Sequence, residues 1–325
     1  MILVISPGRW RGLRTTSSPS GRFAILAFDQ RGTYRRMLPE GTSYQDAVQI
    51  KREVVAALSP HATAVLLDPI YGLDAMLHLD GRSGLLLCLE KTGYAGEATQ
   101  RRVDWIDGWT IEKIRRLGAS AVKLLVYYHP DAGALTQEIE DVVAQVVAES
   151  HAHDLPLFLE PVSYSLDAAV PKQSAAFAAH RPAIVAETAR RLSRLGVDVL
   201  KLEFPVDAAF NDDESDWQAG CEAISAACAV PWALLSAGVD FETYERQVRI
   251  ACAAGASGFL AGRAIWREAI ALPGEARQRF LATTATDRLQ RLSAIVEESA
   301  RPWTDFYHPI APVEGWFHHY PASTD

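Results

Sequence analysis

Cysteine is scarce in this chain of 325 residues. There are four, and no two of them have the CxxC spacing of a thiolate metal site or a redox-active dithiol. Cys88 lies in an apolar run, and Cys221, Cys228 and Cys252 lie in stretches with helical periodicity. Such cysteines are usually small buried hydrophobic residues of a reducing compartment, and we interpret all four in this way.

Long apolar runs and a signal peptide are also missing. No apolar stretch approaches the roughly 20 residues of a membrane span. Residues 1–6 are apolar but too short for a signal peptide, and arginines follow them at positions 9, 11 and 14. We therefore expect a cytoplasmic protein that does not contact the membrane.

Net positive charge is absent, because the formal charge is −8. This balance argues against nucleic acid and anionic membranes as partners, since both attract basic patches. It does not exclude an anionic small molecule, because a few local cations dominate the potential in a cleft.

Histidine gives no metal signal either. His151 and His153 diverge on a predicted helix, and His318 and His319 lie in the tail, so we expect no metal site.

Eight short apolar runs recur along the chain, and apolar residues make up 49% of it. Each run has the length of a strand, and most are continuously apolar, as in parallel strands that are covered on both faces. The predicted strands are Phe23–Phe28, Thr63–Leu67, Gly84–Leu89, Ala121–Tyr127, Leu155–Leu159, Val197–Glu203, Trp232–Leu235 and Gly258–Ala261.

Helical patterns separate these runs, for example Ser43–Leu58, Ala134–His153, Ala183–Leu195 and Phe241–Ala254. Eight βα units predict an α/β fold of the (β/α)8 TIM-barrel type in one domain. The alternative is an open doubly wound sheet, but no GxGxxG follows the first strand. We expect an N-terminal extension over residues 1–21, the barrel over 22–300 and a tail over 301–325. The tail is rich in aromatic residues and proline, and we expect it to pack on the body or on a neighbouring subunit.

Charged residues interrupt three adjacent strands that are otherwise apolar. Lys123, Glu160 and Lys201 lie in the predicted strands 4, 5 and 6, in the later half or at the end of each. Active sites of these barrels form at the C-terminal ends of the strands, and neighbouring strands are about 4.8 Å apart, so the three side chains can converge.

This combination is typical of imine-forming lysine chemistry. A lysine amine attacks a carbonyl only when neutral, and burial and a second nearby cation both favour the neutral form. A carboxylate between two lysines can move the protons of imine formation and C–C cleavage. The pattern does not say which lysine forms the imine. A structural alternative is ion pairing, for which Glu203 has the same strand parity as Lys201.

The last two strands end in small residues. Ser236 and Gly238 follow strand 7, and Gly262 and Arg263 follow strand 8. Barrels often bind phosphate with these two loops, so we expect backbone N–H groups and the Arg263 guanidinium to bind an anion.

Strand 1 ends in Asp29, Gln30 and Arg31. We expect Asp29 and Gln30 to bond sugar hydroxyls. Arg31 has two interpretations, as a ligand for an anionic end of the substrate or as the partner of Asp29.

Many of these segments together resemble the class I tagatose 1,6-bisphosphate aldolase family, which includes bacterial sulfofructose phosphate aldolases. The likeness runs from about Phe23 to Glu298. It comprises residues 27–32 (AFDQRG), 67–73 (LDPIYGL), 90–94 (EKTGY), 121–123 (AVK), 159–160 (LE), 198–201 (DVLK), 203–206 (EFPV), 235–239 (LSAGV) and 262–266 (GRAIW). The aromatic tail matches neither branch of this family.

The resemblance implies roles for individual residues. The family's Schiff-base lysine corresponds to Lys201, its acid/base glutamate to Glu160 and its second active-site lysine to Lys123. Its strand 1 glutamine corresponds to Gln30, and its phosphate site to the segments around Ser236 and Arg263. It implies a barrel with no metal requirement and no cofactor other than the covalent imine, assembled as a homodimer or homotetramer.

The function that we expect is therefore class I cleavage of tagatose 1,6-bisphosphate to dihydroxyacetone phosphate and glyceraldehyde 3-phosphate. The same chemistry on 6-deoxy-6-sulfofructose 1-phosphate, which gives sulfolactaldehyde, stays open at this stage. Two rivals belong to other classes: a non-catalytic regulator that senses a metabolite, and a metal-dependent lyase.

Overall fold

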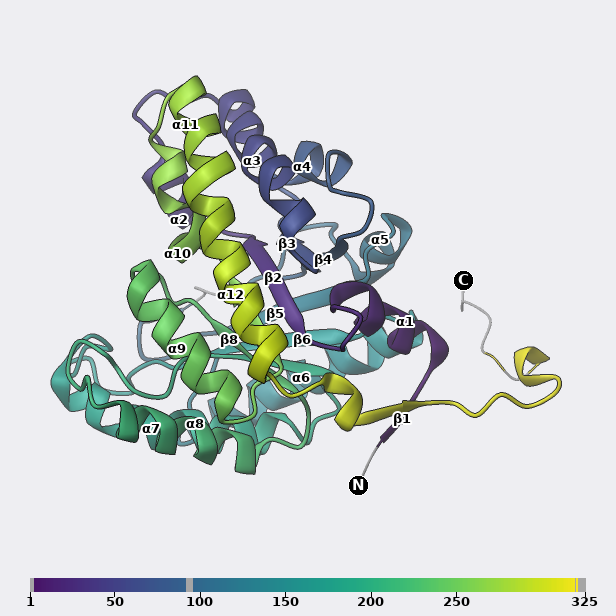
Figure 1. Cartoon of the computed structure of the whole chain (residues 1–325). Coiled ribbons are helices and arrows are strands. Elements are labelled where there is room, and N and C mark those ends of the chain that lie inside the picture. The colour runs from purple at the N-terminus through teal and green to yellow at the C-terminus, as the bar shows by residue number, and fades with distance from the viewer. Residues whose placement is uncertain (1–2, 92–95, 319, 321–325) are drawn as a thin grey trace.

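Eight parallel strands close into a barrel in the order in which they occur along the chain, β2-β3-β4-β5-β6-β7-β8-β9. The structure is a computed structural model, and it describes residues 3–91, 96–318 and 320 (Figure 1). The barrel strands are β2 (Phe23–Phe28), β3 (Ala64–Leu67), β4 (Gly84–Cys88), β5 (Ala121–Tyr127), β6 (Leu157–Val162), β7 (Val199–Leu202), β8 (Trp232–Leu235) and β9 (Gly258–Ala261). The predicted TIM barrel is confirmed.

The strands form where the sequence is continuously apolar, because both faces are covered. All six residues of β2 are buried, as are all residues of β3, β4, β7, β8 and β9. The barrel closes where β2 pairs with β9, with Phe23 opposite Gly258. A Cβ at position 258 would lie 1.9 Å from the Phe23 carbonyl oxygen, and φ there is +136°, so closure requires glycine.

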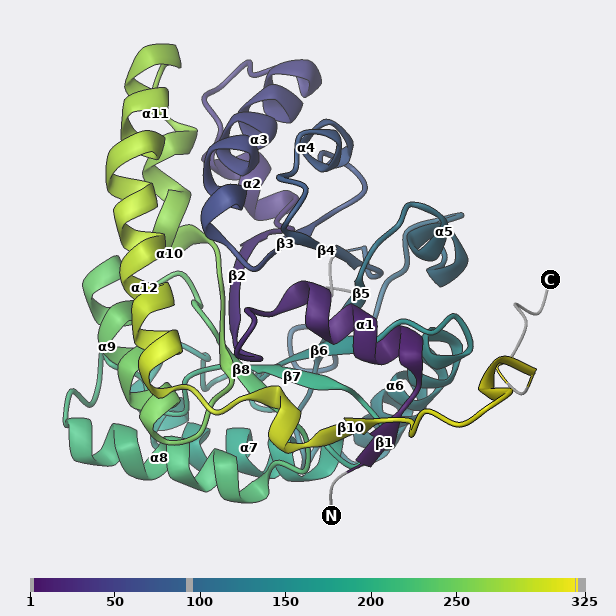
Figure 2. The same ribbon diagram turned by 45° about the vertical axis from the view of Figure 1, so that its right-hand side comes forward.

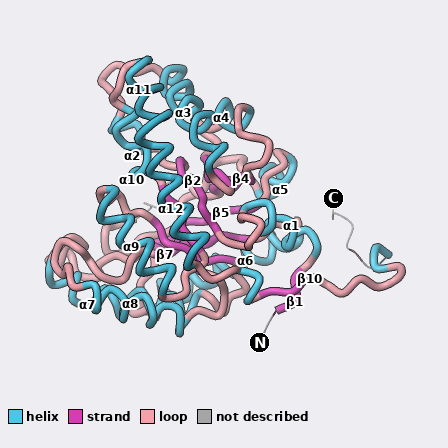
Figure 3. The backbone as a smooth tube through the Cα atoms, viewed as in Figure 1, coloured by secondary structure: helices cyan, strands magenta, loops and turns pink. Residues whose placement is uncertain are grey.

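Helices surround the barrel as an outer layer (Figure 3). The longer ones are α3 (Tyr44–Leu58), α6 (Ala134–Ala152), α7 (Ala175–Leu192), α8 (Glu214–Ala227), α9 (Phe241–Ala253) and α12 (Thr286–Ser299). The shorter ones are α2 (Gly32–Met37), α4 (Leu73–Leu77), α5 (Ile111–Arg116), α10 (Arg263–Trp266) and α11 (Gly274–Phe280).

Local sequence explains most helix boundaries. Ser43 caps α3 through a capping box with Asp46, which fixes the start where the sequence predicted it. Helix α7 begins at Ala175, after the Ser174 cap, and the predicted start at Ala183 was wrong. The reason is Pro182, which lies inside α7 although proline lacks the N–H that a helix interior uses.

A segment near each end of the chain lies at the N-terminal end of the barrel, and the two segments pair there. Strand β1 (Leu3–Ile5) leads into α1 (Pro7–Thr16) and pairs in parallel with β10 (Tyr307–Pro309) (Figure 2). Trp303 is fully buried against Trp10, with ring centroids 4.7 Å apart. Tyr307 donates a hydrogen bond of 2.7 Å to the Asp198 carbonyl. This part of the tail packs on the body, as expected.

The described tail beyond Pro309 is different. It runs away from the barrel in both Figure 1 and Figure 2, and Trp316 and Phe317 are 40% and 60% exposed. Their contacts include one another, with ring centroids 6.3 Å apart. His319, one of the two histidines of the tail, lies outside the described residues, as do Thr92, Gly93 and Tyr94 of the EKTGY segment. None of the helices described is long and apolar enough to cross a membrane.

Candidate active site

A cleft of about 1140 Å³ opens at the C-terminal ends of the barrel strands. Its floor is charged, because three strands end in or carry ionisable residues. Lys123 lies on β5, Glu160 on β6 and Lys201 on β7, and all three are buried. Asp29 directly follows β2, and Glu90 lies two residues beyond the end of β4. The alternation of side chains along a strand turns these residues into the barrel rather than toward the helices.

Lys123 is the centre of the charge cluster. Its Nζ lies 2.9 Å from Asp29 Oδ2, 2.8 Å from Glu90 Oε1 and 2.9 Å from Glu160 Oε2. Burial would lower the pKa of Lys123, but the three carboxylates together raise it well above its ordinary value. Lys123 therefore stays an ammonium ion at any physiological pH.

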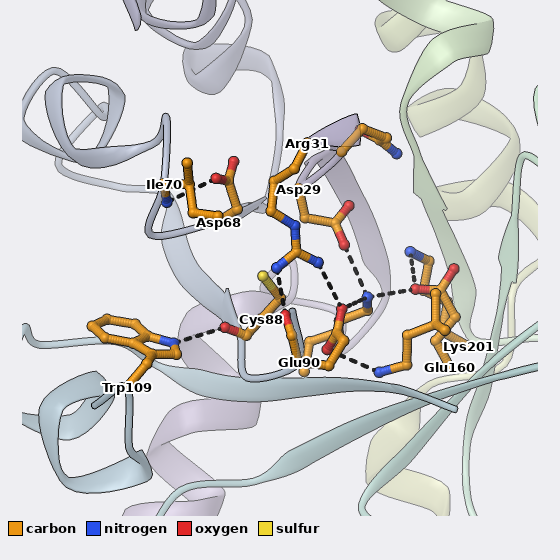
Figure 4. Close-up of polar contacts among 12 residues, drawn as sticks. Asp29, Arg31, Asp68, Ile70, Cys88, Glu90, Trp109, Glu160 and Lys201 are labelled. Atoms are coloured by element: carbon orange, nitrogen blue, oxygen red, sulfur yellow. Dashed lines mark hydrogen bonds and ion pairs between the residues drawn. The ribbon is translucent and has the colours of Figure 1, made fainter. Parts of the chain in front are cut away.

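Lys201 has a different environment. Among the described residues, Glu160 is the carboxylate that contacts it, with 2.9 Å between Lys201 Nζ and Glu160 Oε2 (Figure 4). The same oxygen contacts Lys123, so one carboxylate oxygen joins both amines. Lys201 is 3% exposed and lies beneath Glu160, which lines the cleft. The two lysines, equivalent by sequence pattern, are not equivalent in the fold.

Asp29 completes the floor as an anion. Burial by itself would raise the pKa of its carboxyl. The positive charges of Lys123, Lys201 and Arg31 outweigh this effect and hold the pKa well below the usual range. Gln30 lines the cleft beside it, and its buried Oε1 has no hydrogen-bond partner in the described structure. Both residues line the cleft, and their hydrogen bonds to sugar hydroxyls stay a prediction.

Arg31 pairs with Glu90. Its Nη2 lies 3.3 Å from Glu90 Oε1, and its Nη1 donates to the Glu90 backbone carbonyl (Figure 4). The interpretation of Arg31 as the partner of Asp29 is therefore wrong for the described structure. Glu90 also accepts a hydrogen bond of 3.0 Å from Leu125 N.

Sequence reasoning gave Glu90 too little weight. It directly follows a strand, which is the feature that identified Glu160, but the charged residue beside it obscured the signal. That neighbour, Lys91, turns outward and pairs with Asp104 at 3.1 Å. Asp68 has a structural role in the fold. It forms a fully buried ion pair with Lys51 and accepts hydrogen bonds from Ile70 N and Tyr71 N, both 2.9 Å (Figure 4).

Glu203 does not neutralise Lys201, although strand parity allowed it. Its carboxylate accepts hydrogen bonds from Ser163 N and Oγ at 2.7 and 2.5 Å, and it pairs with Lys172. Burial would raise the pKa of Glu203, but Lys172 and Arg181 lower it to about 2. This group ties the segment after β6 to the end of β7. The structural alternative for Lys201 therefore lacks its predicted partner.

The segments after β8 and β9 lie against each other at the rim. Ser236 Oγ accepts a hydrogen bond of 3.4 Å from Gly262 N, and Arg263 Nη2 donates to the Ala237 carbonyl at 3.2 Å. Ala237 and Gly238 have positive φ, +45° and +85°. A Cβ at Gly238 would lie 2.7 Å from Arg263 Cζ, so the absence of a side chain lets the guanidinium lie against the backbone. We call this group, Ser236 to Gly238 with Gly262 and Arg263, the anion cradle.

None of the described histidines lines the cleft. His151 Nε2 is 3.0 Å from Asp198 Oδ2, at the start of β7 and thus at the opposite end of the barrel. Within the described ranges, no group of three His, Cys, Asp or Glu side chains is arranged to hold a metal ion.

The sequence is similar to known aldolases over most of its length. The profile of the DeoC/LacD family of aldolases matches residues 23–268. The tagatose 1,6-diphosphate aldolase of Lactococcus lactis subsp. lactis is 33% identical, over 93% of this chain and 99% of the relative. The corresponding enzyme of Listeria monocytogenes serovar 1/2a is 35% identical, over 95% of this chain and 97% of the relative.

Solved structures share the fold at lower identity. An archaeal fructose 1,6-bisphosphate aldolase superposes with a TM-score of 0.59 and 21% identity, over 89% of this chain and 98% of that one. The fructose-bisphosphate aldolase of Slackia heliotrinireducens gives a TM-score of 0.61 at 16% identity, over 90% and 89%. These structures support the barrel architecture.

Proposed function

The chain belongs to the DeoC/LacD family of aldolases, and we propose that it is a class I aldolase that cleaves a ketose 1,6-bisphosphate through an imine on Lys201. The observation that carries this proposal is the shared oxygen of Glu160, which contacts Lys201 and Lys123 at 2.9 Å each. One carboxylate can thus take protons from, or return them to, an imine on Lys201, while Lys123 remains charged.

The two lysines divide the work. Three carboxylates hold Lys123 as an ammonium ion, so it cannot attack a carbonyl. Glu160 takes a proton from the Lys201 ammonium group, the neutral amine attacks the ketose C2 carbonyl, and a proton passes from the nitrogen to the carbinolamine oxygen. Glu160 then returns its proton to that oxygen, and water leaves to give the iminium ion.

Cleavage then follows from the same two residues. Glu160 removes the proton of the C4 hydroxyl, the C3–C4 bond breaks, and its electron pair moves into the iminium to form an enamine on Lys201. The aldehyde product leaves. The enamine takes a proton at C3, and water hydrolyses the resulting iminium to release dihydroxyacetone phosphate and regenerate the free amine.

Substrate orientation comes from the rest of the site. The anion cradle would hold the phosphate on C1, with the Ser236 hydroxyl, backbone N–H groups and the Arg263 guanidinium as donors. Asp29 and Gln30 would bond the hydroxyls of the carbon chain. Tagatose 1,6-bisphosphate is the substrate that the curated relatives support. Their names say that they act on it, and they cover nearly the whole chain.

A cleavage assay tests this function. The purified chain would be given tagatose 1,6-bisphosphate, and separately 6-deoxy-6-sulfofructose 1-phosphate, and the released dihydroxyacetone phosphate would be measured by coupled reduction. We expect cleavage of the bisphosphate at a rate that excess chelator leaves unchanged. Loss of activity on chelation would favour the metal-dependent lyase, and folded protein with no turnover would favour the non-catalytic regulator.

A further inference from the structure

Arg101 lies across the cleft from the anion cradle, and we propose that it binds the anionic group at the far end of the substrate. This inference rests on the proposed function and extends it, because it assigns the residue that distinguishes a substrate with an anion on C6 from one without. The ligand chemistry is a terminal oxyanion, a phosphate or a sulfonate.

The order of the strands places the substrate. The cradle follows β8 and β9, Lys201 lies on β7 and Glu160 on β6. In the proposed reaction these groups act on C1, C2 and C4, so the carbon numbering follows the strands around the barrel in descending order. Continued in the same direction, C6 lies over β5 and β4. In a closed eight-stranded barrel, these are the strands opposite β9 and β8.

Arg101 is the cation that this path reaches. It belongs to the segment between β4 and α5, and it lines the cleft together with Tyr127, the last residue of β5. The same cleft is lined by Arg263 of the cradle, so one continuous space joins the two arginines.

The guanidinium of Arg101 is held in place. Its Cζ lies 4.6 Å from the centroid of the Tyr127 ring, and its Nε donates a hydrogen bond of 3.1 Å to the Ala98 carbonyl. The segment that carries it is anchored at both ends, because Lys91 N donates to the Asp104 carbonyl at 2.7 Å and Trp109 Nε1 to the Cys88 carbonyl at 2.9 Å. A planar guanidinium that is already oriented binds tetrahedral oxyanions with little further loss of entropy.

Three other cations that line the cleft form ion pairs with carboxylates. Arg31, which follows β2, pairs through its guanidinium with Glu90. Lys172 and Arg181 surround the Glu203 carboxylate. The expectation that Arg31 binds the second anionic end therefore gives way to Arg101.

The test compares three substrates and two neighbouring arginines. Cleavage of a ketose 1,6-bisphosphate, its 6-deoxy-6-sulfo analogue and the ketose 1-phosphate would be measured for the full chain, for Arg101→Gln and for Arg102→Gln. Arg102 is the matched control, because it pairs with Glu138 on the surface. Arg101→Lys, which keeps the charge and loses the fork, is a second variant in case the first does not fold.

We expect Arg101→Gln to lower the ratio of kcat/KM for the 1,6-bisphosphate to that for the 1-phosphate by roughly 10- to 100-fold, mainly through KM. Arg102→Gln should leave this ratio within about twofold, and Arg101→Lys should give an intermediate value. A larger loss with the bisphosphate identifies a phosphate site, and a larger loss with the sulfo analogue a sulfonate site.

Two results would overturn the inference while the proposed function stands. One is wild-type protein that cleaves the bisphosphate and the 1-phosphate equally well. The other is an Arg101 variant with an unchanged ratio. Wild-type protein that cleaves none of the three substrates would instead refute the proposed function.

Discussion

Glu160 and the two lysines show how position assigns chemistry to residues of the same type. Sequence pattern brought Lys123 and Lys201 to adjacent regions of the barrel but left open which of them forms an imine. The fold separates them by their partners. Lys123 touches three carboxylates, and among the described residues Lys201 touches one, which it shares. The number of carboxylates around each lysine depends on the fold, because the three carboxylates come from β2, β4 and β6, which are not consecutive strands.

Replacing Glu160 tests the proton transfers at the residue scale. Glu160→Gln keeps the shape of the side chain and removes the base. We expect kcat for ketose bisphosphate cleavage to fall by about 100- to 10,000-fold, as for loss of a general acid/base, with KM changed much less. Glu138→Gln, on the surface, is the control. A Glu160 variant with a kcat within tenfold of the wild type would contradict the assigned role.

Sequence reasoning reached most of this site and missed particular parts of it. Lys123, Glu160 and Lys201 were visible as charges in apolar strands. Glu90 was given little weight, because it follows its strand beside a second charge that turns outward. Arg101 gave no signal, because it lies 13 residues beyond the end of β4 in a segment with no regular pattern. Its place depends on Tyr127 and on backbone hydrogen bonds that no local pattern encodes.

At the scale of elements, the apolar runs predicted all eight strands to within three residues at either end, with the largest difference at the C-terminal end of β6. The agreement arises because parallel strands that are covered on both faces are almost continuously apolar, so their sequence stands out from the helices and loops. Helix α7 was the less accurate element. Its first two turns precede Pro182, and proline ordinarily argues against a helix interior. Tertiary packing of Phe177 and Arg181, both buried, holds these turns in place.

The segment between β6 and α7 is tied to β7 by a titratable group, which predicts a pH dependence. The pKa of Glu203 is lowered from 4.5 to about 2 in the folded protein. Its contribution to the free energy of unfolding is therefore present above about pH 4.5 and is lost as the pH falls toward 2. From the size of the shift, this contribution is about 3 kcal/mol.

Urea unfolding of wild type and Glu203→Gln at several pH values measures this contribution. We expect the variant to be less stable at pH 7 and the difference to shrink between pH 4.5 and pH 3, because protonation of Glu203 removes the same interactions. Glu222→Gln, at an exposed position of helix α8, is a control whose difference in stability from the wild type should not change with pH in this way. A difference that stays constant from pH 7 to pH 3 would contradict the account.

Two segments near the ends of the chain, α1 and residues 303–309, pack at the N-terminal end of the barrel, away from the cleft. Arg9 of α1 binds Asp198 through Nε and Nη2 at 3.0 and 2.6 Å, and Tyr307 donates to the backbone carbonyl of the same residue. Helix α1 and strand β10 thus meet at Asp198, the residue that precedes β7 and lies three positions before Lys201. The expected dimer or tetramer stays a prediction, which light scattering of the full chain would test.

Truncation separates the packed and exposed parts of the tail. A chain that ends at Pro309 keeps Trp303 and Tyr307, and we expect its melting temperature to stay within about 2 °C of the full chain. A chain that ends at Ala300 loses both buried aromatic side chains, and its melting temperature should fall by on the order of 10 °C. Equal stability of the two truncated chains, in thermal unfolding followed by circular dichroism, would show that the tail does not stabilise the barrel.

The central claim is the imine on Lys201, and borohydride trapping tests it most directly. The full chain would be incubated with dihydroxyacetone phosphate, reduced with borohydride and digested, and the modified peptide would be identified by mass spectrometry. The account predicts a reduced adduct on Lys201, and none on Lys123, whose amine three carboxylates hold as a cation. An adduct on Lys123, or no adduct from protein shown to be folded, would contradict it.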